Sequence, residues 1–417
     1  MLYHLTDAQK RQCMKYAYHE SNSSIHEKWM KPVWDRVESY IPDYICATTI
    51  TSIGLVANLV PCILLMTLAP TAEETVPSLF LLWCCLGMFI HQNLDNMDGR
   101  HARRFGVENP ITDFFDHTAD VITAGITVIN VSIATKLGNF PEWMICFVLI
   151  FLVVFYSYHW QVYNSALVKF GMFDVTESQD VAILFVLVSA AAGQDIWSVQ
   201  IHVLENQSVD VRKICLVMAC LGGILKVIQN LVSICNSSFK QSVKLTTSKW
   251  LELLFPAWPI ICNVLCLYFA CCASPVFYLQ YPVLLSATIT IMIAKPILEI
   301  MIAHFTHSTM AALTLNEVAM VMFLVNANVS LVDIKQSLVI LLLFGCLDFG
   351  IYFYGIQSDM HDCMGFKWFQ LTTHGKVEQR HHEVKVKPIV KERKEASGKE
   401  RKEANDKQTK MKYLFQY

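Results

Sequence analysis

Four aspartates in a largely apolar part of the sequence are the residues best suited to chemistry. Asp95 and Asp98 are three residues apart, and Asp116 and Asp120 are four apart, so each pair falls on one face of its own helix. A charge within a membrane span costs roughly 3 kcal/mol or more, so four such acids should face a cavity and bind something. Hard cations such as Mg²⁺ take carboxylate, phosphate and water oxygens as ligands. The pattern therefore predicts two divalent cations that handle a diphosphate.

A simpler interpretation places these acids at helix ends, neutralised by the nearby Arg100, Arg103 and Arg104. It explains any single aspartate about as well as a metal site does. It explains poorly why four aspartates share this spacing, and we therefore favour the metal site.

The composition indicates that the helices carrying these acids belong to a membrane protein. Hydrophobic residues make up 54% of the 417 residues, charged residues make up 16%, and the mean hydropathy is +0.39. Such values predict an all-α polytopic membrane protein. Apolar stretches of spanning length predict about ten transmembrane helices, near 46–69, 76–94, 118–136, 143–160, 179–194, 213–235, 251–272, 282–303, 311–327 and 334–356. We interpret the fifteen cysteines as small apolar residues, because their spacing fits no zinc or disulfide framework.

The charge of the connecting loops predicts the orientation. The connections near 70–75 and 195–212 contain a single Lys or Arg residue, Arg212. The alternate connections carry the basic residues Arg100, Arg103, Arg104, Lys169, Lys240, Lys244 and Lys249. We expect the basic side and both chain ends to face the cytosol. Residues 1–40 contain no uninterrupted apolar core of a secretory signal, so we expect the first span to act as its own insertion signal.

The sequence divides into four expected segments. Residues 1–45 form a cytosolic segment with an amphipathic interfacial helix, although an ordinary packed helix fits the pattern equally. Residues 46–235 hold the catalytic core with the first six spans, and residues 236–356 hold the last four. Residues 357–417 form a Lys/Glu-rich cytosolic tail that we expect to be disordered. The apolar residues at helical spacing in the first segment are Ile25, Trp29, Met30, Val33, Trp34 and Val37.

The aspartate run also resembles the signature of the CDP-alcohol phosphotransferases. The order D-x-x-D-G-x-x-A-R followed by D-x-x-x-D is matched at Asp95, Asp98, Gly99, Ala102, Arg103, Asp116 and Asp120. Further motifs at 159–163 and 170–177 are similar to the eukaryotic choline and ethanolamine phosphotransferases. Two positions depart from the family pattern: Thr112 replaces a glycine, and Ala47-Thr48 replaces a Pro-Asn pair whose Asn lies near the cytidine.

The resemblance implies transfer of phosphocholine or phosphoethanolamine from CDP-choline or CDP-ethanolamine to diacylglycerol, forming the phospholipid and CMP. It implies two Mg²⁺ or Mn²⁺ ions, with Asp95 and Asp116 bridging both ions. Asp98 would complete one ion's ligands and Asp120 the other's.

The resemblance also implies roles for the neighbouring residues. Arg103, following Gly99, would hold a nucleotide phosphate, and Thr48 would lie near the cytidine. His117 would accept the proton of the lipid hydroxyl, and a hydrogen bond to a metal ligand is its alternative role. We further expect residence in the endoplasmic reticulum or Golgi membrane, a homodimer, and no nucleic-acid partner.

Two other classes of protein remain open. One is a metal-dependent transferase of polyprenyl diphosphate, which the Ala102-Arg103 pair disfavours. The other is a non-catalytic relative or a cation transporter, which retention of the four aspartates with Arg103 and His117 disfavours. Separately, Lys295 and Glu299 lie four residues apart in the eighth predicted span. They form either a structural ion pair or the lining of a lipid access path.

Overall fold

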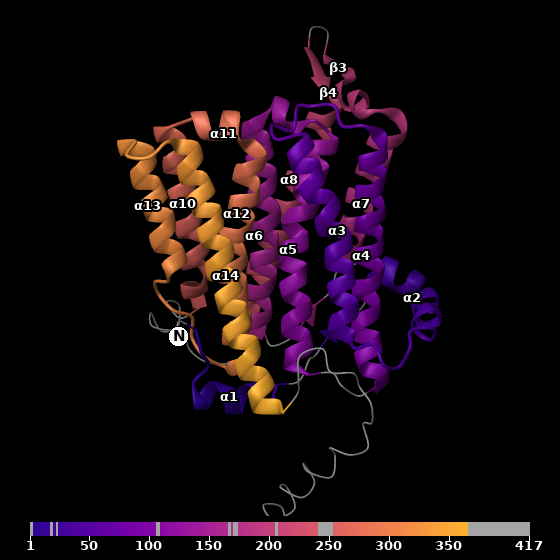
Figure 1. Ribbon diagram of the computed structural model, residues 1–417, viewed down its shortest axis with the longest axis vertical. Helices are drawn as coiled ribbons and strands as arrows, with labels where there is room; N and C mark the ends of the chain where they lie inside the picture. Colours follow the sequence, from indigo (N-terminus) through magenta and orange to yellow (C-terminus); the bar gives the residue numbers. More distant parts are fainter. Residues whose placement is uncertain are drawn as a thin grey trace, which may run out of the picture. The chain divides into compact units, whose positions relative to one another are not determined.

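Long helices dominate the computed structural model (Figure 1). It describes residues 3–16, 20–21, 24–105, 109–165, 168–169, 174–204, 207–240 and 253–365. The all-α polytopic class is confirmed. Most of the predicted tail, from residue 366 onward, lies outside the described residues.

The helices follow the chain in a simple order. Their bounds are α1 Asp7–Cys13, α2 Ile25–Glu38, α3 Ala47–Leu68, α4 Ser78–Phe105, α5 Pro110–Ala134, α6 Pro141–Ser165, α7 Val175–Ala192, α8 Val211–Lys240, α10 Trp258–Ala273, α11 Val276–Gln280, α12 Pro282–Thr306, α13 Leu315–Val329 and α14 Ile334–Met364. Short 3₁₀ turns occupy η1 Leu137–Asn139, η2 Gln194–Ser198 and η3 Phe255–Ala257.

Each of the ten predicted spans coincides with one of these helices. Among the described residues, eight helical segments are long and apolar enough to cross a membrane: α3, α5, α6, α7, α8, η3 with α10, α12 and α14. The helix α4 is not among them, because its apolar first half is followed by the polar stretch that carries Asp95 and Asp98. The helix α13 has only 15 residues. Of the ten predicted spans, α4 and α13 are therefore the two that are too polar or too short to count as membrane-spanning helices.

The core is built around α5 and α12, which lie at the centre of the helix group in Figure 1. Most side chains of both helices are buried. Glycines let neighbouring helices approach closely, as in other membrane proteins. A Cβ atom at Gly87 of α4 would lie 2.2 Å from the Ala57 carbonyl oxygen of α3, and one at Gly125 of α5 would lie 2.0 Å from Thr290 Cγ2 of α12. These close contacts pack the aspartate-bearing helix α4 against α3 and the aspartate-bearing helix α5 against α12.

The amphipathic helix predicted near the amino terminus is present as α2. One side packs on α4, where the indole Nε1 of the buried Trp34 donates a hydrogen bond to Asn93 Oδ1 at 2.9 Å. The other side leaves Trp29 81% exposed, together with Val33 and Val37. Both interpretations of this helix therefore describe part of it, and its position at a membrane surface stays a prediction.

The sequence analysis predicted no strands, and the described residues contain four short ones. β1 (Glu20–Ser21) pairs in parallel with β2 (Val168–Lys169), and β3 (Gln200–Leu204) forms an antiparallel hairpin with β4 (Gln207–Asp210). In Figure 1 the hairpin stands at the end of the helix group opposite α1. All fifteen cysteines are free.

Candidate active site

The second half of α4 and the first half of α5 line a common cavity of about 200 Å³. All eight predicted site residues line it: Thr48, Asp95, Asp98, Gly99, Arg103, Asp116, His117 and Asp120. The helical spacing of each aspartate pair therefore places both pairs toward one space. The structure brings every one of the predicted residues together.

The start of α5 is fixed by a capping box. The Asn109 side chain accepts hydrogen bonds from the backbone N–H groups of Ile111 at 2.9 Å and Thr112 at 3.1 Å. In return, the backbone N–H of Asn109 donates to Thr112 Oγ1 at 3.3 Å. Thr112, which stands where the family resemblance predicts a glycine, thus stabilises the helix that carries Asp116 and Asp120.

The carboxyl groups of the four aspartates lie close enough to interact with one another. The Thr51 hydroxyl of α3 donates a hydrogen bond to Asp98. Two other buried carboxylate oxygens, Asp95 Oδ1 and Asp116 Oδ1, lack a hydrogen-bond partner among the described residues. A buried carboxylate oxygen without a partner is costly unless a cation binds it. The donor set therefore fits one or more hard divalent cations.

Two overlapping groups of side chains could hold such an ion. The ligand atoms of His91, Asp95 and Asp120 lie within 4.8 Å of one another, and so do those of Asp116, His117 and Asp120. Asp120 is common to both groups. The specific division of ligands between two ions that the resemblance implies stays a prediction.

His117 is oriented by two neighbours. Its Nδ1 lies 3.4 Å from Asp120 Oδ2, and its ring packs edge-on against His159 with 5.6 Å between centroids. About a fifth of its side chain is exposed, at 21%. A histidine that donates from Nδ1 to a carboxylate presents an unprotonated Nε2 when it is neutral. Both the base and the hydrogen-bonding role remain compatible with this arrangement.

His91 is a candidate ligand that the sequence analysis missed. It is buried on α4, and neither ring nitrogen has a hydrogen-bond partner among the described residues. The signal was present in the sequence, because His91 stands four residues before Asp95 and seven before Asp98, on the same helical face. A Cβ atom at Gly54 of α3 would lie 3.2 Å from His91 Nδ1. The glycine therefore leaves space for the imidazole.

Two of the three arginines near the motif form ion pairs with acids of α2. Arg100 pairs with Asp35 at 3.0 Å, and Arg104 pairs with Glu38 at 3.2 Å, both acids belonging to α2. The interpretation in which these arginines neutralise the aspartates is therefore not supported by their ion pairs. Arg103 is exposed and lines the cavity, and a Cβ atom at Gly99 would lie 3.8 Å from its guanidinium nitrogens.

Asp35 itself sits in a cationic setting outside the spans. Lys31 donates to Asp35 Oδ2 at 3.0 Å, and Arg100 approaches the other oxygen. These cations lower the pKa of Asp35 below its usual value, the hydrogen bond from Lys31 contributing most. The carboxylate therefore stays ionised and holds α2 to the end of α4.

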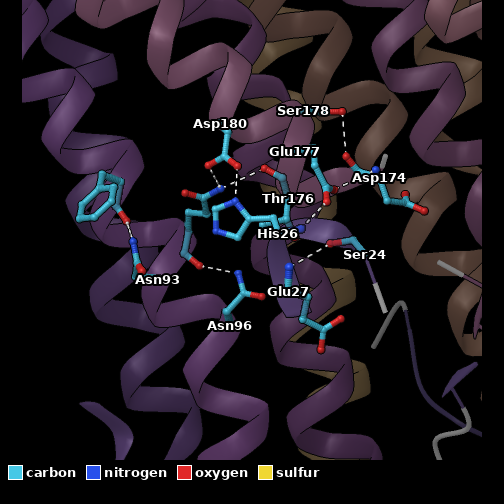
Figure 2. A network of polar contacts seen from close by, with 12 residues as sticks. Ser24, His26, Glu27, Asn93, Asn96, Asp174, Thr176, Glu177, Ser178 and Asp180 are labelled. Atoms are coloured by element: carbon cyan, nitrogen blue, oxygen red, sulfur yellow. Dashed lines mark hydrogen bonds and ion pairs between the residues drawn. The ribbon is translucent and has the colours of Figure 1, made fainter. Parts of the chain in front are cut away.

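Figure 2 shows a second polar network that fastens α2 beside the cavity. His26 of α2 points at Asp180 of α7 and bonds to it through Nδ1, while the His26 backbone N–H donates to Glu177 Oε1 at 2.8 Å. Gln92 of α4 donates to Asp180 Oδ1 at 2.8 Å. Because Ser24 of the N-cap and residues of α7 line the cavity, this network fixes one wall of it.

The fold and the site define a polytopic helical membrane protein with an acidic cavity at the junction of two helices. Residues 44–224 match the CDP-alcohol phosphatidyltransferase family. The matched part of the chain contains every predicted site residue.

The chain is similar to proteins named cholinephosphotransferase 1. The protein of that name from Homo sapiens is 35% identical over 221 residues, covering 53% of this chain and 53% of the relative. The one from Gallus gallus is 36% identical over 202 residues, covering 48% of this chain and 60% of the relative. The chain spans about half the length of the curated relatives it matches.

Proposed function

We propose that the protein transfers phosphocholine from CDP-choline to diacylglycerol, forming phosphatidylcholine and CMP, with CDP-ethanolamine as an alternative donor. The observation that carries the proposal is the convergence of four aspartates on one cavity, where two buried carboxylate oxygens have no partner among the described residues. The names of the relatives support the choice of donor, and the family match at 44–224 contains every predicted site residue.

Asp95, Asp98, Asp116 and Asp120 would hold two Mg²⁺ or Mn²⁺ ions. Bound there, the ions would neutralise the charge of the diphosphate and of the departing CMP. The hydrogen bond from Thr51 would keep Asp98 in place for this role. His91 adds a nitrogen ligand beside Asp95 and Asp120.

The remaining residues bind the donor and move the proton. Arg103 would hold a phosphate of the nucleotide, with Gly99 beside it and Thr48 near the cytidine. The lipid hydroxyl oxygen forms a bond to the phosphorus that carries choline, while the bond from that phosphorus to the CMP oxygen breaks. His117 Nε2 takes the hydroxyl proton, because the Asp120 carboxylate holds the Nδ1 proton and stabilises the resulting imidazolium.

We further propose that the protein resides in the endoplasmic reticulum or Golgi membrane as a homodimer, with the cavity and both termini in the cytosol. The charge bias of the predicted loops supports this orientation. The division into an amino-terminal segment, a catalytic core at 46–235, the helices of 236–356 and a tail is part of the same proposal.

The test is CMP release by the purified full chain with diacylglycerol and either CDP-choline or CDP-ethanolamine. Mg²⁺, Mn²⁺ and EDTA are compared, together with Asp116→Asn. We expect metal-dependent release that the substitution lowers about 10³-fold or more, because transition-state charge loses its counter-charge. Asp195→Asn is the control, since this carboxylate is 84% exposed and pairs with Lys136 away from the cavity. Release that persists in EDTA and in Asp116→Asn contradicts the proposal.

A further inference from the structure

A second cavity, of about 560 Å³, lies among the carboxyl-terminal helices. Its lining shares no residue with that of the aspartate cavity. It is bounded by the amino-terminal segment around residues 3–9, the last turns of α12, the connection from α12 to α13, and one face of α14. Its volume falls in the range of about 300–1,000 Å³ that is usual for small-molecule sites.

A buried ion pair stands beside this cavity. Lys295 of α12 is 1% exposed, and its Nζ lies 2.5 Å from Asp348 Oδ2 of α14. The same ammonium donates to the Tyr3 hydroxyl at 2.8 Å, and that hydroxyl donates to Asp348 Oδ1 at 2.7 Å. Lysine, aspartate and tyrosine thus satisfy one another in a closed triangle.

Glu299 lies next to Lys295 but is not part of this triangle. It is 9% exposed and lines the cavity, and its Oε1 lies 3.7 Å from Lys295 Nζ, beyond hydrogen-bond distance. Its other oxygen, Oε2, is buried without a hydrogen-bond partner among the described residues. Leaving such an oxygen unsatisfied is costly. The geometry therefore calls for a ligand that donates a hydrogen bond.

The lining of the cavity combines polar residues, such as Gln9, Ser308 and Thr314, with aliphatic ones. Ile302, Ala303 and Ile356 line its interior. At the rim, Leu313 is 64% exposed, and Leu315 and Val318 are also exposed. Exposed aliphatic side chains on a membrane protein contact acyl chains without cost, because lipid tails are as apolar as leucine. Glu299 precedes the end of α12 by seven residues, or roughly 10 Å of helix, so a head group placed there would lie within reach of the membrane interface.

We propose that this cavity binds the head group of a glycerolipid that donates an O–H or N–H hydrogen bond to Glu299 Oε2. The hydroxyl of diacylglycerol and the ammonium of an aminophospholipid share this chemistry. The head group of phosphatidylcholine does not, because its quaternary nitrogen carries no hydrogen. The proposal concerns binding alone and does not require the transfer reaction.

The test uses the full chain in phosphatidylcholine nanodiscs that contain a trace of a photoactivatable lipid. Diacylglycerol, phosphatidylethanolamine and phosphatidylcholine analogues, each with a diazirine near the glycerol, are compared, and labelled peptides are identified by mass spectrometry. We expect diacylglycerol or phosphatidylethanolamine to label residues 299–318 about 10-fold more than phosphatidylcholine does, as loss of a hydrogen bond to a buried carboxyl group predicts. The analogue that labels more strongly identifies the source of the donor.

Variants decide whether Glu299 is responsible. Glu299→Leu should reduce labelling to the phosphatidylcholine level, whereas Glu142→Leu, which removes an exposed acid from the first turn of α6, should leave it unchanged. If Glu299→Leu does not fold, Val318→Trp at the exposed rim narrows the opening without touching the acid and should also reduce labelling. Equal labelling by all three lipids, or labelling that survives in folded Glu299→Leu or in Val318→Trp, overturns the proposal.

Discussion

The aspartate cavity of α4 and α5 and the buried cluster of α12 and α14 both gather ionisable side chains among packed helices, but they balance charge differently. In the second, Lys295, Asp348 and Tyr3 satisfy one another within 2.8 Å. In the first, four carboxylates gather while Arg100 and Arg104 pair with acids of α2. The comparison separates a cluster whose charges cancel within the protein from a group of carboxylates that could hold a cation.

The largest expected effect concerns His117 in the aspartate cavity. His117→Ala should lower kcat for CMP release by about 10²–10⁴-fold, the usual contribution of a general base. His117→Gln retains hydrogen bonding to Asp120 but cannot accept the proton, so it should be equally impaired. A fully active Gln variant would assign His117 the hydrogen-bonding role instead. His202→Ala, at an exposed strand position, is the control.

Substitutions in the cluster of Lys295, Asp348 and Tyr3 should change the stability of the protein. Lys295→Met leaves Asp348 buried without its cation, and should lower the free energy of unfolding by about 3–5 kcal/mol. The double variant Lys295→Met/Asp348→Leu removes both charges and should recover much of the loss. Thermal unfolding in detergent measures both. A double variant as unstable as the single one would show that the pair does more than cancel its own charge.

Metal binding should distinguish the two clusters directly. A divalent ion at about 100 times its dissociation constant stabilises the protein that binds it by about 2.7 kcal/mol. We expect Mg²⁺ or Mn²⁺ to raise the unfolding temperature of the wild type relative to EDTA, and Asp95→Asn to lose most of this shift. Asp348→Asn should keep the shift despite its lower stability. Equal shifts in Asp95→Asn and wild type would contradict the metal site.

The smallest expected effect tests the wall that α2 gives to the aspartate cavity. His26→Ala removes the side-chain bond to Asp180 and the ring stacked on Trp34 at 5.6 Å. Loss of about 1 kcal/mol of hydrogen bonding should raise KM for the CDP-alcohol about 5-fold. His26 does not line the aspartate cavity, so kcat should change little. A fall in kcat with KM unchanged would assign this network another role.

Much of the aspartate site was predictable because its information is local. The separations within 95–98 and 116–120 fix which side chains share a helical face, whatever the rest of the chain does. His91 lies on that same face and was missed only because the pattern was not extended back by one turn. The predicted spans likewise coincide with helices, since apolar length is a property of each segment alone.

Other features depended on contacts between distant segments. Thr51 reaches Asp98 because α3 packs closely on α4, and Arg100 and Arg104 pair with Asp35 and Glu38 because α2 folds back onto them. The β3–β4 hairpin was not predicted, since its strands are only five and four residues long and lie outside any buried sheet.

The sequence by itself determined the membrane class, the helices and the four aspartates, because composition and helical periodicity act within a few turns of the chain. Only the tertiary structure decided which cations meet which acids. Lys295 and Glu299 share a helix face in the sequence. The Lys295 ammonium nevertheless donates hydrogen bonds to Asp348 and Tyr3, which lie near opposite ends of the chain. The packing of the helices decides which acid pairs with a given cation, and no local sequence pattern encodes that packing.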